Sequence, residues 1–339
     1  MKIHILFEMV DGPWGGGNQF LKALKNYLLD EGVYTGSIEE SDIILFNSHH
    51  SLDQILELRE VHPLKCFIHR LDGPVSLIRN SSPVIDQYIF KTNDIVADGT
   101  IFQSNWSFKK SIQLGYEDKT PHATIVNAPN PILFNRINRD QHQLVAKLRI
   151  IITSWSNNMR KGFDVYQWMD ENLDFSKYEI TFYGNSPIEF KNIVSKAPLS
   201  SEELSIELKK SDVFVTASKS DTCSNSLIEA LHCGNVALVY NDGGHPEILG
   251  STGEKFDSVE EIPKLLELIH DDWHNYAKNF DLPNFDQVGK QYMEFMDLTY
   301  KNKRDKSHVA GSKKITWKLL KLRLRANELL ATIKNKFKF

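Results

Sequence analysis

The feature that most constrains the fold is an alternation of short apolar runs with longer amphipathic segments. In the first part of the chain, the runs KIHILFEM (2–9), DIILFNS (42–48) and CFIHRLD (66–72) predict buried strands. The segments between them place apolar residues at helical spacing. Strands alternating with helices of about 10–15 residues are typical of βαβ units and therefore of a parallel sheet. The sequence predicts an α/β fold.

The alternation stops and then starts again. The stretch NRINRDQHQ (135–143) is polar and has no periodicity, and LRIIITS (148–154) and YEITFYG (178–184) follow it as new strands. A chain of 339 residues suits about two domains. We therefore predict two Rossmann-like, doubly wound domains, residues 1–140 and 141–283. Ligands of such sheets bind beyond the carboxyl ends of the strands, so we expect the site in a cleft between the domains.

Composition excludes several protein classes. Hydrophobic residues are 41% and charged residues 25%, as in ordinary globular proteins. The sequence contains no run of 18 apolar residues, so we expect no transmembrane helix. Its first residues predict a strand and not a secretory signal. The three cysteines show neither a disulfide framework nor zinc-binding spacing, which favours a reducing cytosol. They are Cys66, Cys223 and Cys233.

Charge is distributed unevenly along the chain. Residues 301–339 contain 13 Lys/Arg and 2 Asp/Glu, whereas the remainder contains 27 Lys/Arg and 42 Asp/Glu. Binding to a phosphate backbone needs clustered cations. The acidic main body therefore argues against nucleic acid as the main substrate, and the basic end of the chain is a separate feature.

The segment from Asp221 to Glu229 lies between a predicted strand and a predicted apolar helix. Backbone N–H groups at a helix start have no intrahelical acceptor, and with the helix dipole they attract anions such as phosphate. Glu229, about one turn further on, could accept hydrogen bonds from ribose hydroxyls. A structural alternative stays open, because Ser226-x-x-Glu229 also fits a helix capping box.

Two loops after predicted strands could approach a ligand. Arg160 and Lys161 precede Gly162 and could neutralise a diphosphate, although a solvated loop with a glycine turn fits the same residues. The loop GPWGGG (12–17) could let the backbone approach a ligand closely, or could simply form a tight turn. It does not match the dinucleotide-binding pattern GxGxxG.

His69 ends a predicted buried strand, where α/β enzymes often present catalytic residues. It could transfer a proton or bind a sugar hydroxyl, but a histidine at such a position is also a common core residue. Asp72, three residues later, could likewise have a purely structural role and form a turn with Gly73.

Several motifs are absent from the sequence. It contains no Asp-x-Asp pair to hold a divalent metal on a diphosphate, and no His/Cys cluster with zinc spacing. It also contains no GxSxG nucleophile elbow and no Walker A loop. Hydrolase and P-loop kinase functions therefore lose support.

Taken in order, these segments resemble the family 4 glycosyltransferases of the GT-B fold. The decisive stretch is SKSDTCSNSLIEALHCGNVALVYNDGGHPEIL (218–249), which is similar to the family's E-x7-E element followed by its Gly-Gly-x-Pro-Glu loop. RKGFD (160–164) resembles the donor-phosphate segment, and FQSNWS (102–107) and NAPNP (127–131) resemble first-domain elements. The resemblance covers most of residues 1–300.

The resemblance implies a retaining, metal-independent transferase that uses a nucleotide-sugar, such as a UDP- or GDP-sugar, and needs no cofactor. It places the diphosphate on Lys161 and Arg160, the donor sugar near Asp221 and the ribose on Glu229. The helix-start amides that would assist the phosphate belong to Cys223, Ser224, Asn225 and Ser226.

The resemblance also assigns roles in the first domain, residues 1–140. Gly16 and Gly17 would let the first loop close on the donor, and His69 would lie near the reacting sugar. Residues 284–302 would form a helix that crosses back to the first domain.

The chain departs from the family pattern at two positions. The first acidic position is Asp221 where glutamate is usual, which shortens its reach by one methylene. Many members have an arginine about six residues before the lysine, where this chain has Trp155. Neutralisation of the phosphates would then depend more on Lys161.

The basic end of the chain, residues 303–339, predicts a polar linker followed by an amphipathic helix. Residues 313–339 carry 9 Lys/Arg on one face and apolar residues on the other. Such a helix could bind an anionic membrane surface, dock on the acidic main body or pack on the first domain. We expect a cytoplasmic protein, with peripheral attachment to the inner face of the membrane as one form.

The function predicted from the sequence is transfer of a hexose-type sugar to a glycan or lipid-linked acceptor, as in bacterial surface polysaccharide synthesis. Two alternatives remain at this point. One is a nucleotide-sugar epimerase of the same fold, and the other is a noncatalytic sugar-nucleotide-binding or membrane-associated scaffold protein. Contacts to the donor base and sugar in this fold are largely backbone and loop contacts, which leave little trace in residue identity.

Overall fold

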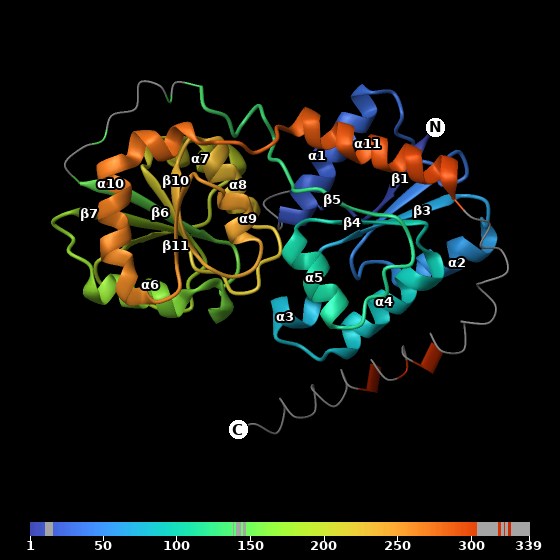
Figure 1. Cartoon of the computed structure of the whole chain (residues 1–339), viewed down its shortest axis with the longest axis horizontal. Coiled ribbons are helices and arrows are strands. Elements are labelled where there is room, and N and C mark those ends of the chain that lie inside the picture. Colours follow the sequence, from blue (N-terminus) through green and yellow to red (C-terminus); the bar gives the residue numbers. More distant parts are fainter. Residues whose placement is uncertain are drawn as a thin grey trace. The chain divides into compact units, whose positions relative to one another are not determined.

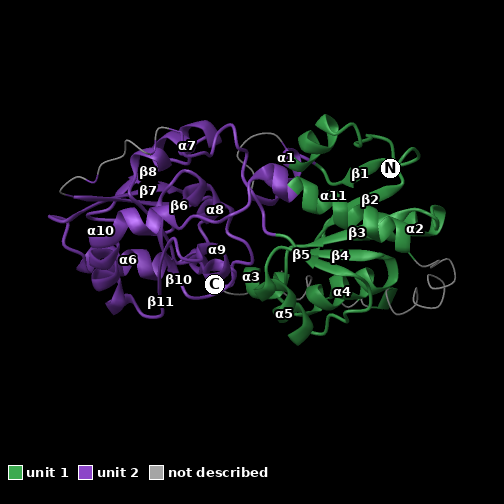
Figure 2. Cartoon of the chain, turned by 45° about the horizontal axis from the view of Figure 1, so that its top comes forward, with its two compact units in different colours: residues 1–8, 24–125, 289–339 green, residues 9–23, 126–288 purple. Residues whose placement is uncertain are grey.

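The computed structural model describes residues 1–10, 16–137, 139, 144, 147–303, 318, 319, 322, 325 and 326. The chain forms two compact units, and each is built from segments that are distant in sequence (Figure 2). Unit 1 comprises Met1–Glu8, Leu24–Ile125 and the chain from Gly289 onward; unit 2 comprises Met9–Ala23 and Val126–Val288.

Unit 1 contains a five-stranded sheet in the order β1-β2-β3-β4-β5, and all its strand pairs are parallel. Tyr34 makes a further parallel bridge to Ile3 of β1, on the side away from β2. The strands are β1 (Ile3–Leu6), β2 (Ile43–Asn47), β3 (Cys66–Leu71), β4 (Gly99–Phe102) and β5 (His122–Thr124).

Helices pack on the unit 1 sheet and bury its apolar side chains. Helices α2 and α4 share one core with Phe46 and Phe67, and Gly99 of β4 leaves room for Phe295 and Thr299 of α11. Gly289 of α11 likewise packs closely on Tyr27 of α1. The helices are α1 (Gly16–Asp30), α2 (Leu52–Val61), α3 (Val75–Arg79), α4 (Val84–Val96), α5 (Asn105–Gln113) and α11 (Phe285–Asn302).

Unit 2 contains a six-stranded parallel sheet in the order β11-β10-β9-β6-β7-β8. The chain starts at the central strand β6, moves outward to β8, and then returns to lay β9, β10 and β11 on the other side. This reversal is the topological switch point of a doubly wound sheet. The strands are β6 (Leu148–Ser154), β7 (Tyr178–Gly184), β8 (Val194–Lys196), β9 (Val213–Thr216), β10 (Val236–Tyr240) and β11 (Gly253–Phe256).

Helices cover both faces of the unit 2 sheet (Figure 1). Ile150 and Ile152 of β6 pack with α6 and α10, whereas Ile151 packs with α7, α8 and α9, because successive strand residues point to opposite faces. The helices are α6 (Phe163–Asn172), α7 (Ser201–Lys210), α8 (Asn225–His232), α9 (His245–Leu249) and α10 (Ile262–Lys278), with 3-10 turns η2 (Met159–Lys161) and η3 (Val259–Glu261).

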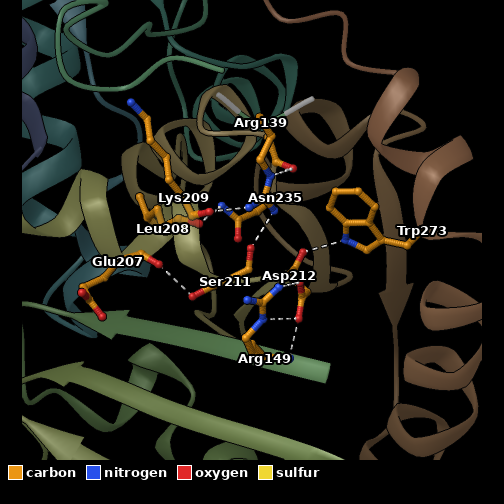
Figure 3. A network of polar contacts seen from close by, with 10 residues as sticks. Arg139, Arg149, Glu207, Leu208, Lys209, Ser211, Asp212, Asn235 and Trp273 are labelled. Atoms are coloured by element: carbon orange, nitrogen blue, oxygen red, sulfur yellow. Dashed lines mark hydrogen bonds and ion pairs between the residues drawn. The ribbon is translucent and has the colours of Figure 1, made fainter. Parts of the chain in front are cut away.

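The predicted division of the chain at residue 140 differs from the structure, in which the longer segment of unit 2 starts at Val126 and Met9–Ala23 also belongs to that unit. Arg139 is one of the residues that join this stretch to unit 2, although the sequence pattern places it in a boundary loop. Its buried guanidinium donates to the carbonyl oxygens of Lys209, Ser211 and Gly234, at 2.6, 2.6 and 3.1 Å (Figure 3). One polar residue therefore ties the supposed linker into unit 2.

The same network continues around a buried carboxylate. Asp212 accepts hydrogen bonds from the Arg149 side chain at 2.7 and 2.9 Å, and its carbonyl oxygen accepts from the indole N–H of Trp273 (Figure 3). The ring of Trp273 also lies 5.2 Å from the Arg139 guanidinium. Buried charges of this kind need partners, and here the partners join β6, β9 and α10.

The predicted fold class is confirmed: the chain forms two doubly wound α/β units. The predicted crossover helix is α11, which begins in unit 2 and continues in unit 1. The predicted basic helix, 313–339, lies outside the described residues except at isolated positions. Within the described part of the chain, no helix combines the length and apolar character needed to span a membrane.

Candidate active site

A pocket of about 380 Å³ opens at the carboxyl edge of the unit 2 sheet. Thr153 and Ser154 at the end of β6 line it, together with Ser218 and Asp221 in the loop after β9. These two strands are neighbours at the point where the strand order reverses. Doubly wound sheets bind their ligands at this position. All the residues that line the pocket belong to unit 2.

Lys161 reaches the pocket because Gly162 allows the preceding turn to lie against β9. Gly162 has φ +92°, and a Cβ atom there would lie 2.4–2.6 Å from Ala217 atoms, two of which belong to the backbone. Any other residue would therefore clash and adopt an unfavourable backbone conformation. The side chain of Asn158 accepts a hydrogen bond from the Arg160 N–H at 3.0 Å and starts the turn.

Lys161 and Asp221 meet inside the pocket. Their Nζ and Oδ2 atoms lie 3.1 Å apart, and both residues line the cavity. Burial alone would raise the pKa of Asp221, but the charges of Lys161 and His245 and the Cys223 amide outweigh it, so the pKa is lowered. The positive charge that the sequence analysis assigned to a diphosphate is thus already balanced by a carboxylate.

The Gly-Gly-x-Pro-Glu loop holds the backbone of Asp221. The N–H of Gly244 donates to the Asp221 carbonyl oxygen at 2.8 Å. Gly243 has φ +69°, and a Cβ atom there would lie 2.2 Å from the same oxygen. The close approach explains why glycine stands at 243, and it fixes the loop that leads into α8.

Helix α8 points its first turn at the pocket. Ser224 caps the helix by accepting a hydrogen bond from the Leu227 N–H at 3.4 Å. Cys223, Ser224, Asn225 and Ser226 all line the cavity, and the amides of the first turn have no intrahelical acceptor. The positive end of the helix dipole therefore faces the same space as Lys161.

Glu229 also lines the pocket, and its role as a capping residue is excluded. The cap is Ser224 and not Ser226, so Glu229 does not occupy the position required for a capping box. No hydrogen bond to its carboxyl group occurs among the described residues, and burial raises its pKa to about 8. At neutral pH this acid is largely protonated, and it is available to exchange hydrogen bonds with ligand hydroxyls in the pocket.

Of three further residues predicted to bind the donor, only one lines the pocket. Arg160 does not line the pocket; its guanidinium donates to the Ser220 hydroxyl at 3.0 Å. Gly16 lines the pocket at the start of α1, where a Cβ atom would lie 1.8 Å from the amide nitrogen of Asn225. Gly17 has open space around it and does not line the pocket.

His69 lies in unit 1 and has no exposed surface. Its ring stacks on Phe46, with 4.2 Å between ring centroids, and both nitrogens have partners at 3.0 Å: the Ser48 carbonyl oxygen and the Asn93 amide. Burial lowers its pKa to about 4. This is the environment of a core histidine, and contact with a substrate would require the ring to become uncovered. Its role in catalysis stays a prediction.

Sequence reasoning missed one wall of the pocket. This wall is mostly apolar and follows β7 and the start of α7; it consists of Tyr183, Gly184, Pro198, Leu199, Ser201 and Leu204. The sequence did contain one signal for this wall. Tyr183 and Gly184 are the last residues of a predicted strand, and the carboxyl ends of strands are where such sheets bind ligands. Trp155, which the sequence analysis noted only as a departure, also lines the pocket and is 48% exposed.

The loop after β9, helix α8 and the glycine loop belong to a segment with known relatives. Residues 191–281 match the family described as "Glycosyl transferases group 1". No curated protein sequence matches the chain. The predicted resemblance to glycosyltransferases is confirmed, and assignment to family 4 stays a prediction.

Solved structures extend the likeness to the whole chain at low identity. HepE from Anabaena, in complex with UDP-glucose, is 12% identical and superposes with a TM-score of 0.63, over 93% of this chain and 99% of that one. AviGT4, a glycosyltransferase of avilamycin A biosynthesis, is 14% identical (TM-score 0.59; 89% and 98% covered). Sucrose-phosphate synthase from Thermosynechococcus elongatus is 15% identical (TM-score 0.56; 91% and 79% covered). The chain therefore has the GT-B fold.

Proposed function

We propose that the chain is a glycosyltransferase that binds a nucleotide-sugar donor in the unit 2 pocket. The observation that supports this most directly is the convergence of Lys161, the first turn of α8 and Glu229 on one cavity at the switch point of the sheet. A cation and helix-start amides suit a diphosphate, and a carboxyl group one helical turn away suits a ribose. The group 1 glycosyl transferase segment contains two of these three elements.

The donor that this proposal favours is a UDP- or GDP-sugar, and the acceptor is a glycan or lipid-linked glycan of surface polysaccharide synthesis. HepE has been solved with UDP-glucose and with UDP and glucose. The apolar wall formed by Tyr183, Leu199 and Leu204 offers an apolar surface for a nucleobase. This wall lies in the same cavity as the diphosphate site, as one extended donor requires.

The proposed chemistry stabilises the leaving nucleoside diphosphate. As the bond to the sugar breaks, negative charge grows on a phosphate oxygen, and fixed donors that already point there lower the barrier. Lys161 and the α8 amides supply such donors without a metal ion. The acceptor hydroxyl attacks the face from which the diphosphate leaves and gives its proton to the departing phosphate oxygen. The configuration is therefore retained, and no enzyme carboxylate is glycosylated. Isolation of a glycosylated Asp or Glu would refute this route.

The decisive experiment presents the protein with UDP-, GDP- and dTDP-sugars and analyses the products. A transferase releases nucleoside diphosphate and labels an acceptor, or slowly hydrolyses the donor. An epimerase returns donor isomers, and a scaffold protein binds without turnover. Lys161→Met should abolish turnover, while Lys219→Met is the matched control, because Lys219 is a neighbouring lysine paired with Asp164 outside the pocket.

We also propose that residues 313–339 attach the protein to the anionic inner surface of a membrane. The basis is the basic, amphipathic character of that sequence, since the segment lies largely outside the described residues. Flotation with anionic liposomes, compared between the full chain and a variant lacking 305–339, tests the proposal. Undiminished flotation of the shortened chain would remove it.

A further inference from the structure

A cluster of polar side chains lies at the carboxyl edge of the unit 1 sheet, in residues that the donor pocket does not use. Asn47 ends β2, Arg70 and Asp72 lie at the end of β3, and Gln103 follows β4. These three strands are adjacent and parallel, so the ends of the strands meet at one edge. Carboxyl edges of α/β sheets are where such folds bind ligands.

Asp72 is the centre of this cluster. Its Oδ1 accepts hydrogen bonds from Arg70 at 2.5 Å and from the Gln103 amide, and its Oδ2 accepts from the Asn47 amide at 3.2 Å. Arg70 is fully buried and is held further by Tyr292, whose hydroxyl lies 3.1 Å from Nε. Asp72 remains 28% exposed. The network therefore orients one carboxylate and presents an edge of it to solvent.

A strained turn lies beside Asp72. Ser48 and Ser51 have φ values of +48° and +54°, which residues with a side chain rarely adopt, and they flank His49 and His50. The buried His69 supports the turn, because its Nε2 lies 3.0 Å from the Ser48 carbonyl oxygen. Backbone strain of this kind persists where the surrounding structure holds it, often at ligand sites.

The turn presents two imidazole rings next to the carboxylate. The rings of His49 and His50 lie 4.3 Å apart, and His50 also contacts Phe7 edge-to-face at 5.0 Å. Burial, His50 and Arg79 lower the pKa of His49 to about 4, and burial lowers the pKa of His50. At neutral pH both rings are uncharged, and each can donate one hydrogen bond and accept another.

We propose that His49, His50 and Asp72 form a binding site for the hydroxyl groups of an uncharged sugar. This rests on the proposed function, which requires an acceptor besides the donor bound in unit 2, and it assigns the sugar of that acceptor to this edge of unit 1. The carboxylate accepts hydrogen bonds from adjacent hydroxyls, and the rings supply both donors and acceptors. Phe7 adds apolar surface for the C–H face of a sugar ring.

Charge decides between a neutral sugar and an anionic one. The Arg70 guanidinium is buried and already bound by Asp72, Asn47 and Tyr292, so it is committed to the network. The exposed oxygen edge of Asp72 repels carboxylate and phosphate groups, and the neutral imidazoles add no compensating charge. Arg79 is the nearby cation that acts on both rings, but its side chain is exposed, so water and salt screen its charge. The site therefore favours a hexose over a uronic acid or a sugar phosphate.

The test uses saturation-transfer NMR on the full chain with methyl glucoside, methyl galactoside and glucuronic acid as probes, with and without saturating UDP. Wild type should bind at least one neutral glycoside and should bind glucuronic acid at least tenfold more weakly. Asp72→Asn and His50→Ala should each weaken neutral binding about tenfold. Glu57→Gln, an exposed acid on α2 outside the cluster, is the matched control and should bind as wild type does.

A kinetic measurement separates this proposal from the proposed function. With an acceptor that is turned over, Asp72→Asn should raise the acceptor KM about tenfold, while hydrolysis of the donor by water stays unchanged. Equal glycoside affinity and equal acceptor KM in Asp72→Asn and wild type would overturn the site, as would absence of neutral glycoside binding to wild type. Absence of donor turnover in wild type would instead overturn the proposed function. His50→Ala changes an exposed residue, so a folding defect in Asp72→Asn leaves the test intact.

Discussion

The carboxyl edges of the two sheets differ in how their polar groups are assembled. The unit 2 pocket is formed mainly by loops and main chain: a glycine that lets Lys161 approach β9, the first turn of α8, and glycines that hold the Asp221 backbone. The unit 1 edge is formed by single side chains from neighbouring strands, joined through buried Arg70.

This difference explains what each edge can recognise. Helix-start amides and a cation suit phosphate oxygens, which carry charge but little distinguishing shape. A network of fixed side chains around one carboxylate suits hydroxyl groups, whose positions distinguish one sugar from another. The predictions below test this division, beginning with the largest expected effect.

Gly162 lies so close to Ala217 that its replacement should cost more stability than replacement of a glycine that has only a positive φ. Gly162→Ala is expected to lower the free energy of unfolding by about 3 kcal/mol, because the backbone strain is joined by a clash with Ala217. Gly115 has φ +100° but open space around it, so Gly115→Ala should cost only about 1 kcal/mol. Urea denaturation of both variants measures the difference, and equal losses would contradict the close-packing argument.

Lys161 is expected to dominate binding of the diphosphate. Lys161→Met should weaken UDP or GDP binding about 100-fold, or about 2.7 kcal/mol, because the loss of the cation also leaves Asp221 as an unbalanced charge in the pocket. Isothermal titration calorimetry measures it, with Lys219→Met as the control. If the control loses as much affinity, the pocket is not where the diphosphate binds.

Glu229 should make the folded protein less stable as the pH rises. Its pKa is raised to about 8 in the folded state, so between about 4.5 and 8 the unfolded chain loses this proton first and folding stability falls. Each pKa unit corresponds to about 1.4 kcal/mol, and solvent relaxation reduces the net effect to about 2 kcal/mol. Glu229→Gln should therefore stabilise the protein more at pH 9 than at pH 5. Thermal melts at both values check this; a pH-independent difference would show that burial does not shift this carboxyl group.

The residues that sequence reasoning identified are those whose signals are contiguous. Strands β6 and β7 have the predicted bounds, and α7 begins with a capping box between Ser200 and Glu203, two residues only three positions apart. The Lys161 turn and the start of α8 also lie in short, continuous motifs. Local sequence records these features because each depends on residues that are neighbours in the chain.

The features that were missed depend on contacts between distant residues. The apolar wall at Leu199 and Leu204 belongs to the pocket only because α7 begins beside the end of β7. Arg139 looks like a linker residue until the carbonyl groups it binds, about 70–100 residues away, are brought to it. The Asp72 cluster takes one or two residues from each strand, and no spacing along the chain reveals it.

Asp221 is expected to compete with the donor for Lys161. Asp221→Asn keeps an oxygen for the Cys223 amide but removes the charge that pairs with Lys161, so it should tighten binding of UDP or GDP about fivefold, or roughly 1 kcal/mol. The same variant should lower turnover if Asp221 orients the donor sugar. The affinity for UDP or GDP is measured by calorimetry, and the rate of donor turnover is measured on the same variant. Unchanged affinity would mean that the ion pair does not oppose diphosphate binding.

The smallest expected effect distinguishes the two glycines at the start of α1. Gly16→Ala should weaken binding of nucleoside diphosphate about threefold, since the new Cβ would displace the Asn225 side chain from its 2.9 Å hydrogen bond with Asn127, beside the first turn of α8. Gly17→Ala should leave affinity unchanged and stabilise the helix by about 0.5 kcal/mol, because alanine favours helix and nothing lies within 4 Å. If both variants weaken binding equally, the loop needs flexibility at both positions. If only Gly16→Ala does, close packing against Asn225 is what requires glycine there.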